Sequence, residues 1–94
     1  MKLDYKIISF LIRGKRRKNV LFSLDKPKTP KQIADKCEIN LSNVSIALSE
    51  LMKKGLITCL TPNEKLFRFY EISKKGKIAL NHLSKYKEKE QKNY

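Results

Sequence analysis

Two neighbouring helical segments with clear start and stop signals place the strongest constraint on how this chain can fold. The first covers residues 29–37 and opens with Thr29, a good N-cap, and Pro30, which fits the first helical position. The second covers residues 41–54, follows an asparagine N-cap candidate and stops at Gly55, a residue typical of helix C-termini. A tight turn joins them. The second segment carries one stripe of apolar residues at helical spacing, namely Val44, Leu48, Leu51 and Met52.

Apolar patterns on either side of this pair predict the remaining elements. Residues 3–24 carry two helical stripes separated by Gly14, which could divide the segment into two helices. Residues 56–60 and 66–72 are typical of two strands around a turn at 61–65, with alternate residues of the second strand packed and the others partly wet. A last helix follows Ser73.

We therefore expect a mainly α fold with a small β-hairpin. The expected order is helix, helix, helix, strand, strand, helix, with an extra N-terminal helix if Gly14 breaks the first segment. Residues 1–86 would form one domain and residues 87–94 a charged C-terminal tail. The first stripe belongs either to the core or, with the last helix, to the surface of a homodimer; it comprises Ile7, Ile8, Leu11 and Ile12.

The charge balance points to an anionic partner. The chain has 22 Lys and Arg residues against 9 Asp and Glu residues, a net charge of +13. Such a surface attracts polyanions, so nucleic acid is the first candidate and an anionic membrane the second, while a merely solvated lysine-rich surface is the neutral alternative. The sequence has neither a signal-peptide pattern nor an apolar run long enough to span a membrane, so we expect a cytoplasmic protein without a membrane partner.

The two central segments meet the physical needs of a helix-turn-helix. Ala34 provides the small residue that lets the first helix approach the second, and Ile39 provides an apolar residue for the turn. The second helix has an outer face off its apolar stripe, and a major groove about 12 Å wide admits such a helix. The residues of that face, our candidates for contacts with DNA bases, are Leu41, Ser42, Asn43, Ser45, Ile46 and Ser49.

At this level the sequence resembles the winged helix-turn-helix transcription regulators of the ArsR and MarR type, and in particular small archaeal members. The resemblance covers roughly residues 13–83. It rests on Thr29-Pro30 with Ile33-Ala34, on Asn40, Val44, Leu48, Leu51, Gly55 and Leu56, and on Tyr70, Ile72, Ser73 and Gly76. The resemblance implies sequence-selective binding of double-stranded DNA, with a recognition helix at 41–54 and a wing at 61–65 that reaches the backbone or the minor groove.

Two positions depart from the family pattern. Glu38 stands where the family prefers glycine in the turn, and a left-handed conformation there would cost a non-glycine residue roughly 1 kcal/mol, which favours a reshaped turn. The recognition helix also has no Arg or Lys before Lys53, so an arginine cannot read guanine from its N-terminal half. Asn43 can read adenine instead, and we expect weak base specificity or specificity assembled by a dimer.

The positive charge flanks this helix. The basic cluster around Gly14, the start of the segment at 29–37 and the wing carry residues suited to gripping phosphates. These candidate phosphate contacts are Arg13, Lys15, Arg16, Arg17, Lys18, Lys31, Lys65 and Arg68.

Other functional classes receive less support from the sequence. It contains no phosphate-binding glycine loop, metalloprotease motif or nucleophile elbow, so we expect neither an enzyme nor a cofactor or metal site. Cys37 and Cys59 are expected in the core as free thiols, and His82 as a partly buried helix residue. The main alternative is a winged helix that binds another protein within a transcription or chromosome complex, and RNA binding is the third.

Overall fold

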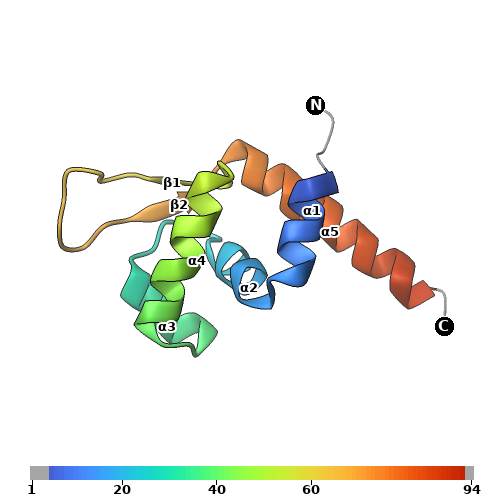
Figure 1. Cartoon of the computed structure of the whole chain (residues 1–94), viewed down its shortest axis with the longest axis horizontal. Coiled ribbons are helices and arrows are strands. Elements are labelled where there is room, and N and C mark those ends of the chain that lie inside the picture. The colour runs from blue at the N-terminus through green and yellow to red at the C-terminus, as the bar shows by residue number, and fades with distance from the viewer. Residues whose placement is uncertain (1–4, 93–94) are drawn as a thin grey trace.

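The computed structural model describes the backbone of residues 5–92 and the side chains of residues 5–85. Five helices and a two-stranded hairpin follow one another in the expected order, with the extra N-terminal helix present (Figure 1). The elements are α1 (Tyr5–Arg13), α2 (Lys15–Ser23), α3 (Pro30–Cys37), α4 (Leu41–Lys53), β1 (Ile57–Cys59), β2 (Tyr70–Ile72) and α5 (Lys74–Lys92). The predicted fold class and element order are confirmed. The start of the first predicted helix at Leu3 and the last two residues of the predicted tail lie outside the described residues.

Local capping explains where α3 and α4 begin. Thr29 Oγ1 accepts a hydrogen bond from the Gln32 amide, and Gln32 Oε1 accepts one from the Thr29 amide, which completes a capping box. Asn40 Oδ1 accepts from the Asn43 amide at 2.8 Å and caps α4. These bonds satisfy amides that have no partner within the helix and thereby fix the starts of both helices.

The turn between α3 and α4 keeps the shape that the family achieves with glycine. Glu38 adopts the left-handed conformation, with φ 57° and ψ 43°. Its amide donates to the Ala34 carbonyl oxygen, and the Ile39 amide donates to the same oxygen at 3.1 Å. The expectation of a reshaped turn is therefore wrong, because these two bonds require the left-handed residue whatever its side chain.

One apolar core joins the helices to the hairpin. Three residues of the first stripe lie in this core, whereas Ile12 is 45% exposed, so the stripe is mainly core. Gly76 lets α5 pack closely, since a Cβ there would lie 2.2 Å from the Leu56 carbonyl oxygen. The buried residues are Ile7, Ile8, Leu11, Val20, Leu21, Leu24, Ile33, Val44, Ala47, Leu48, Leu51, Leu56, Ile57, Ala79 and Leu83.

The hairpin is shorter than the sequence predicts. Its antiparallel register pairs Ile57 with Ile72 and Cys59 with Tyr70, which leaves residues 60–69 as a long loop. The predicted second strand over 66–72 is wrong for residues 66–69, and the expected alternation of packed and wet side chains is absent because all four are exposed. Hydrogen bonds within the loop replace strand pairing there, as described below.

The loop before α3 adds a third backbone segment to the hairpin. The Lys28 amide donates to the Tyr70 oxygen at 3.0 Å, and the Tyr70 amide donates to the Lys28 oxygen at 2.9 Å. The ammonium group of Lys28, a residue only 7% exposed, pairs with Asp25. Lys36 also pairs with Asp25 at 3.1 Å, and the hydrogen bonds from the two lysines hold the pKa of that carboxyl well below its usual range.

Candidate nucleic-acid interface

The outer face of α4 is open to solvent. Val44, Ala47, Leu48 and Leu51 face the core, whereas the opposite side of the helix is uncovered. Of the predicted base-contacting residues, Leu41 is 53% exposed and Ile46 is 56% exposed. Ser42, Ser45 and Ser49 are also exposed, and Asn43 is half-buried. The structure therefore brings the whole predicted set onto an accessible surface, with Asn43 at its edge.

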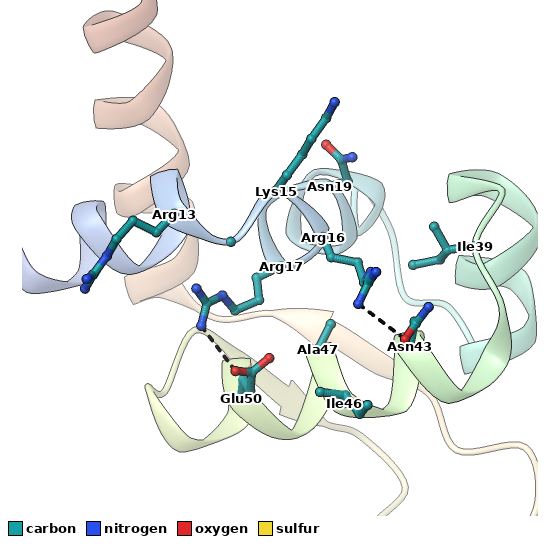
Figure 2. A pocket seen from close by; sticks show the side chains of 11 residues that line it. Arg13, Lys15, Arg16, Arg17, Asn19, Ile39, Asn43, Ile46, Ala47 and Glu50 are labelled. Atoms are coloured by element: carbon teal, nitrogen blue, oxygen red, sulfur yellow. Dashed lines mark hydrogen bonds and ion pairs between the residues drawn. The ribbon is translucent and has the colours of Figure 1, made fainter.

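A basic hollow of about 600 Å³ lies along one side of α4, against the N-terminal turn of α2 (Figure 2). The side chains of Arg16 and Arg17 point from α2 toward α4, whereas that of Lys15 points away. Arg16 Nη1 donates to Asn43 Oδ1 at 3.3 Å, and Arg17 Nη1 donates to Glu50 Oε2 at 3.2 Å. α4 contains no arginine, and α2 places the guanidinium groups of Arg16 and Arg17 beside it.

Arg17 differs from its neighbours because it is held on two sides. Its guanidinium lies 3.9 Å from the ring centroid of Phe10 in α1, in addition to its ion pair with Glu50 in α4. Its side chain is only 19% exposed. Arg17 thus links three helices, and Glu50 offsets its charge.

The remaining basic candidates differ in how freely they can reach an anion. Arg13 and Lys15 are exposed at the junction of α1 and α2, and Lys31 is exposed in the first turn of α3. Lys65 is exposed in the hairpin loop, and Lys18 is half-buried in α2. Arg13 and Lys15 lie at the rim of the basic hollow, and Lys31 and Lys65 line another hollow beside Leu41 at the start of α4.

The hairpin loop lies on the other side of α4. A hollow of about 450 Å³ separates them, lined by Ser45, Ser49 and Met52 of the helix and by Pro62 and Arg68 of the loop. Positions 43, 46, 47 and 50 of the helix line the basic hollow, whereas 45, 48, 49 and 52 line this one. Because α-helical residues advance about 100° each, the two sets lie on opposite sides of the helix. The outer face of α4 is therefore flanked by the basic hollow and by the loop.

Arg68 holds the hairpin loop together from within. Its Nε donates to the Glu64 oxygen at 2.6 Å, and a second guanidinium nitrogen donates to the Pro62 oxygen at 3.5 Å. Thr61 Oγ1 accepts from the Phe69 amide at 3.0 Å. The sequence predicts Arg68 as a phosphate contact. In the structure, two of its guanidinium nitrogens donate to backbone oxygens of the loop.

Structural comparison shows what this arrangement resembles. A MarR family transcriptional regulator from Silicibacter pomeroyi superimposes with a TM-score of 0.72 and 21% identity, over 93% of this chain and 62% of the regulator. The homodimeric winged helix-turn-helix DNA-binding domain of Mb0332 from Mycobacterium bovis, a possible ArsR-family regulator, gives a TM-score of 0.68 and 22% identity, over 89% of this chain and 77% of that domain. FabT from Streptococcus pneumoniae, solved in complex with DNA, gives a TM-score of 0.61 and 23% identity, over 83% of this chain and 57% of FabT.

The chain has the winged helix-turn-helix fold. The resemblance inferred from the sequence is thereby confirmed at the level of fold, with α3 and α4 as the helix-turn-helix and residues 60–69 as the wing loop. The chain spans 52% of the length of one MarR-family regulator of the same fold and 62% of another. The sequence matches no known family model and no curated protein.

Sequence reasoning missed several residues of this winged helix. Glu50 lies two helical turns after Asn43 on the same side of α4, a spacing that could have indicated an acidic partner for the basic cluster. The exposed wing-loop residues Leu66 and Phe67 were assigned to a strand and not to the site.

The two cysteines and the histidine are not among the predicted DNA contacts, and the structure places them as follows. Cys37 and Cys59 are free and half-buried, so their predicted place in the core is only partly met. His82 is exposed on α5, not partly buried as predicted, because Ala79 and Leu83 form the buried side of that helix. Among the described residues, no group of three or more His, Cys, Asp or Glu side chains could hold a metal ion. No helix in the same range is long and apolar enough to cross a membrane.

Proposed function

We propose that this protein binds double-stranded DNA with sequence selectivity and regulates transcription. In this proposal α4 enters the major groove, and the wing loop lies on the backbone or in the minor groove. The observation that carries it is the open outer face of α4, flanked on one side by the basic hollow and on the other by the wing loop. A FabT–DNA complex among the structures of the same fold supports this assignment.

Five exposed cations are the proposed phosphate contacts, because they form no ion pair with a carboxylate of residues 5–85. They are Arg13, Lys15, Arg16, Lys31 and Lys65. Arg17 and Arg68 act instead by holding α4 and the wing loop in place, and half-buried Lys18 lies behind the exposed cations of α2. Phosphate contacts fix the orientation of the protein, whereas the base edges must be read from α4.

We propose that Asn43 reads adenine, and that it does so when its hydrogen bond with Arg16 breaks. Bidentate reading of adenine uses both the oxygen and the nitrogen of an asparagine amide. Arg16 occupies one of the two acceptor positions of Asn43 Oδ1 and restricts the orientation of the amide, so we propose that it releases this oxygen when DNA binds. The released guanidinium is then free for a phosphate or for a base in the same groove. Leu41 and Ile46 are placed to touch thymine methyl groups, and the serines of the outer face to hydrogen-bond bases or phosphates.

We further propose a homodimer built on α1 and α5. Tyr5 and Ile12, one heptad apart on α1, are 87% and 45% exposed and present an apolar strip outside the core. The second half of α5 projects beyond the rest of the chain (Figure 1). The homodimeric Mb0332 domain supports this assembly. A symmetric dimer would present two recognition helices to a palindromic site, with residues 1–86 as the binding unit and 87–94 as a tail.

Binding to duplex DNA, single-stranded DNA and RNA over a series of salt concentrations tests the proposal. We expect a preference for the duplex and a log–log salt slope of about −4 to −5 per chain, since each of five neutralised phosphates contributes about −0.9. Replacing Arg16 and Arg17 by Ala should weaken binding to all sequences alike. Asn43→Ala should change the bases selected from random duplex DNA more than the overall affinity. Lys26→Ala, which removes an exposed charge from the loop before α3, is the matched control and should change neither.

The alternative is a winged helix that binds a protein partner. It is favoured by the exposed apolar residues of α4 and by the absence of Arg and Lys from residues 41–52. Equal, weak binding to all three nucleic acids, unchanged in folded Arg16 and Asn43 variants, would reject the DNA proposal in its favour. No catalytic role is proposed for either function.

A further inference from the structure

The tip of the wing loop carries two large apolar side chains that face solvent. Leu66 is 73% exposed and Phe67 is 78% exposed, although they are adjacent in the chain. Apolar surface of this kind is stabilised when a partner removes it from water. Both residues line a hollow with Leu41, one of the proposed base-contacting residues of α4.

The backbone presents this tip in a fixed and uncommon conformation. Phe67 has a positive φ of 59°, a region that aromatic residues rarely occupy. Arg68 binds two carbonyl oxygens of the loop, and the Leu60 amide donates to the Phe69 oxygen at 2.8 Å. Backbone strain at an exposed loop tip points to a functional requirement, because nothing in core packing demands it there.

The surroundings of the tip specify the chemistry of its partner. Lys65 precedes the apolar pair and Arg68 follows it. The pair lines a cleft of about 460 Å³ together with these two cations, Leu41 and Lys31, so three cations face its one carboxylate, that of Asp35. A partner that fits must offer apolar surface next to negative charge. Stacked bases between two phosphate backbones have this combination, and minor-groove proteins insert apolar side chains between base steps in this way.

We infer that Leu66 and Phe67 form an apolar wedge that enters the minor groove, parts a base step and bends the duplex. This inference rests on the proposed function and adds to it a deformation of the DNA. Lys65 binds the phosphate next to the opened step, and Arg68 keeps the tip rigid as it enters. Sequences that unstack easily, such as pyrimidine–purine steps, are then favoured at a position read by shape and not by hydrogen bonds.

Fluorescence energy transfer between dyes on the two ends of a mixed-sequence duplex measures the bend. We expect the wild-type protein to bring the ends closer and to raise the fluorescence of 2-aminopurine placed within the duplex. The double variant Leu66→Ala/Phe67→Ala should lose both signals and bind roughly tenfold more weakly, with an unchanged salt slope. Phe67→Gly removes the ring yet suits the positive φ, so a loss of bending in this variant cannot be attributed to misfolding.

Phe22→Ala is the matched control, since Phe22 is 44% exposed on α2 and lies outside the proposed surface. This variant should bend DNA as the wild type does. If the wild type binds duplex DNA without bending it, or if the double variant bends it equally, the wedge is rejected while the proposed function stands. If the double variant instead changes the oligomeric state measured by light scattering, the tip is a protein contact. Failure of the wild type to bind any duplex would reject the proposed function itself.

Discussion

Replacing Glu38 by glycine tests whether the turn of the helix-turn-helix stores strain. Glu38 has φ 57° and ψ 43°, which puts the Cβ of an L-residue too close to the following carbonyl oxygen. This conformation costs roughly 1–2 kcal/mol, whereas glycine adds roughly 0.5–1 kcal/mol of unfolded-state entropy. The difference predicts that Glu38→Gly raises the free energy of unfolding by roughly 0.5–1 kcal/mol.

Thermal and urea denaturation followed by circular dichroism would measure this gain. For a chain of this size the midpoint temperature should rise by roughly 2–8 °C. Glu38→Ala separates the backbone from the charge, because it removes the carboxylate and keeps the Cβ. It should leave stability within about 0.5 kcal/mol of the wild type. Asp35→Gly, at an exposed position inside α3, should lower stability, since a helix interior disfavours glycine.

Two outcomes would refute this reasoning. Equal gains from Glu38→Gly and Glu38→Ala would assign the effect to charge and not to the left-handed backbone. A loss of stability in Glu38→Gly would mean that the carboxylate contributes more than the strain removes. Affinity for duplex DNA should be unchanged in Glu38→Gly, since the residue lies outside the proposed contacts.

Three further substitutions address packing, pH and charge. Gly76→Ala should destabilise by roughly 1–3 kcal/mol because its Cβ meets a backbone oxygen at 2.2 Å. Gly55→Ala makes only an ordinary contact with the Lys75 side chain at 3.9 Å and should cost only the strain of its positive φ, about 1 kcal/mol; urea titrations compare the two. Asp25→Asn should have a lower free energy of unfolding than the wild type at neutral pH. This difference should close as the pH falls below about 4, because the lowered pKa of Asp25 means that its carboxylate stabilises the fold only while it is charged. A difference that does not change with pH would contradict this. Glu50→Gln should weaken duplex binding several-fold with an unchanged salt slope, because the ion pair between Glu50 and Arg17 holds α4 in place; a tighter complex with a slope steeper by about 0.9 would show that Arg17 instead reaches a phosphate once it is released.

The features that local chemistry determines could be predicted from the sequence. The caps at Thr29 and Asn40, the break at Gly14 and the stop at Gly55 each depend on residues within one helical turn, and each is present in the structure. The outer face of α4 followed from its apolar stripe alone. The fold class could be predicted from these elements and their order along the chain.

Features that depend on distant partners could not be predicted. Arg17 and Glu50 are 33 residues apart, so neither reveals the other, and the phosphate role predicted for Arg17 took no account of the pair. The strand predicted over residues 66–69 followed an alternating pattern, but side-chain bonds from Arg68 and Thr61 hold that segment as a loop. Glu38 is a third case. The hydrogen bonds of the turn hold it in a left-handed conformation that residues other than glycine disfavour.

The backbone pairing between Lys28 and Tyr70 has a consequence for which substitutions the outer face of α4 can accept. It ties the segment that leads into α3 to the strand that leads out of the wing loop, so main-chain bonds help to hold the wing loop beside the helix-turn-helix. Side chains on the outer face of α4 do not take part in this pairing. They can therefore be exchanged to alter the preferred bases while the footprint on the duplex keeps its length.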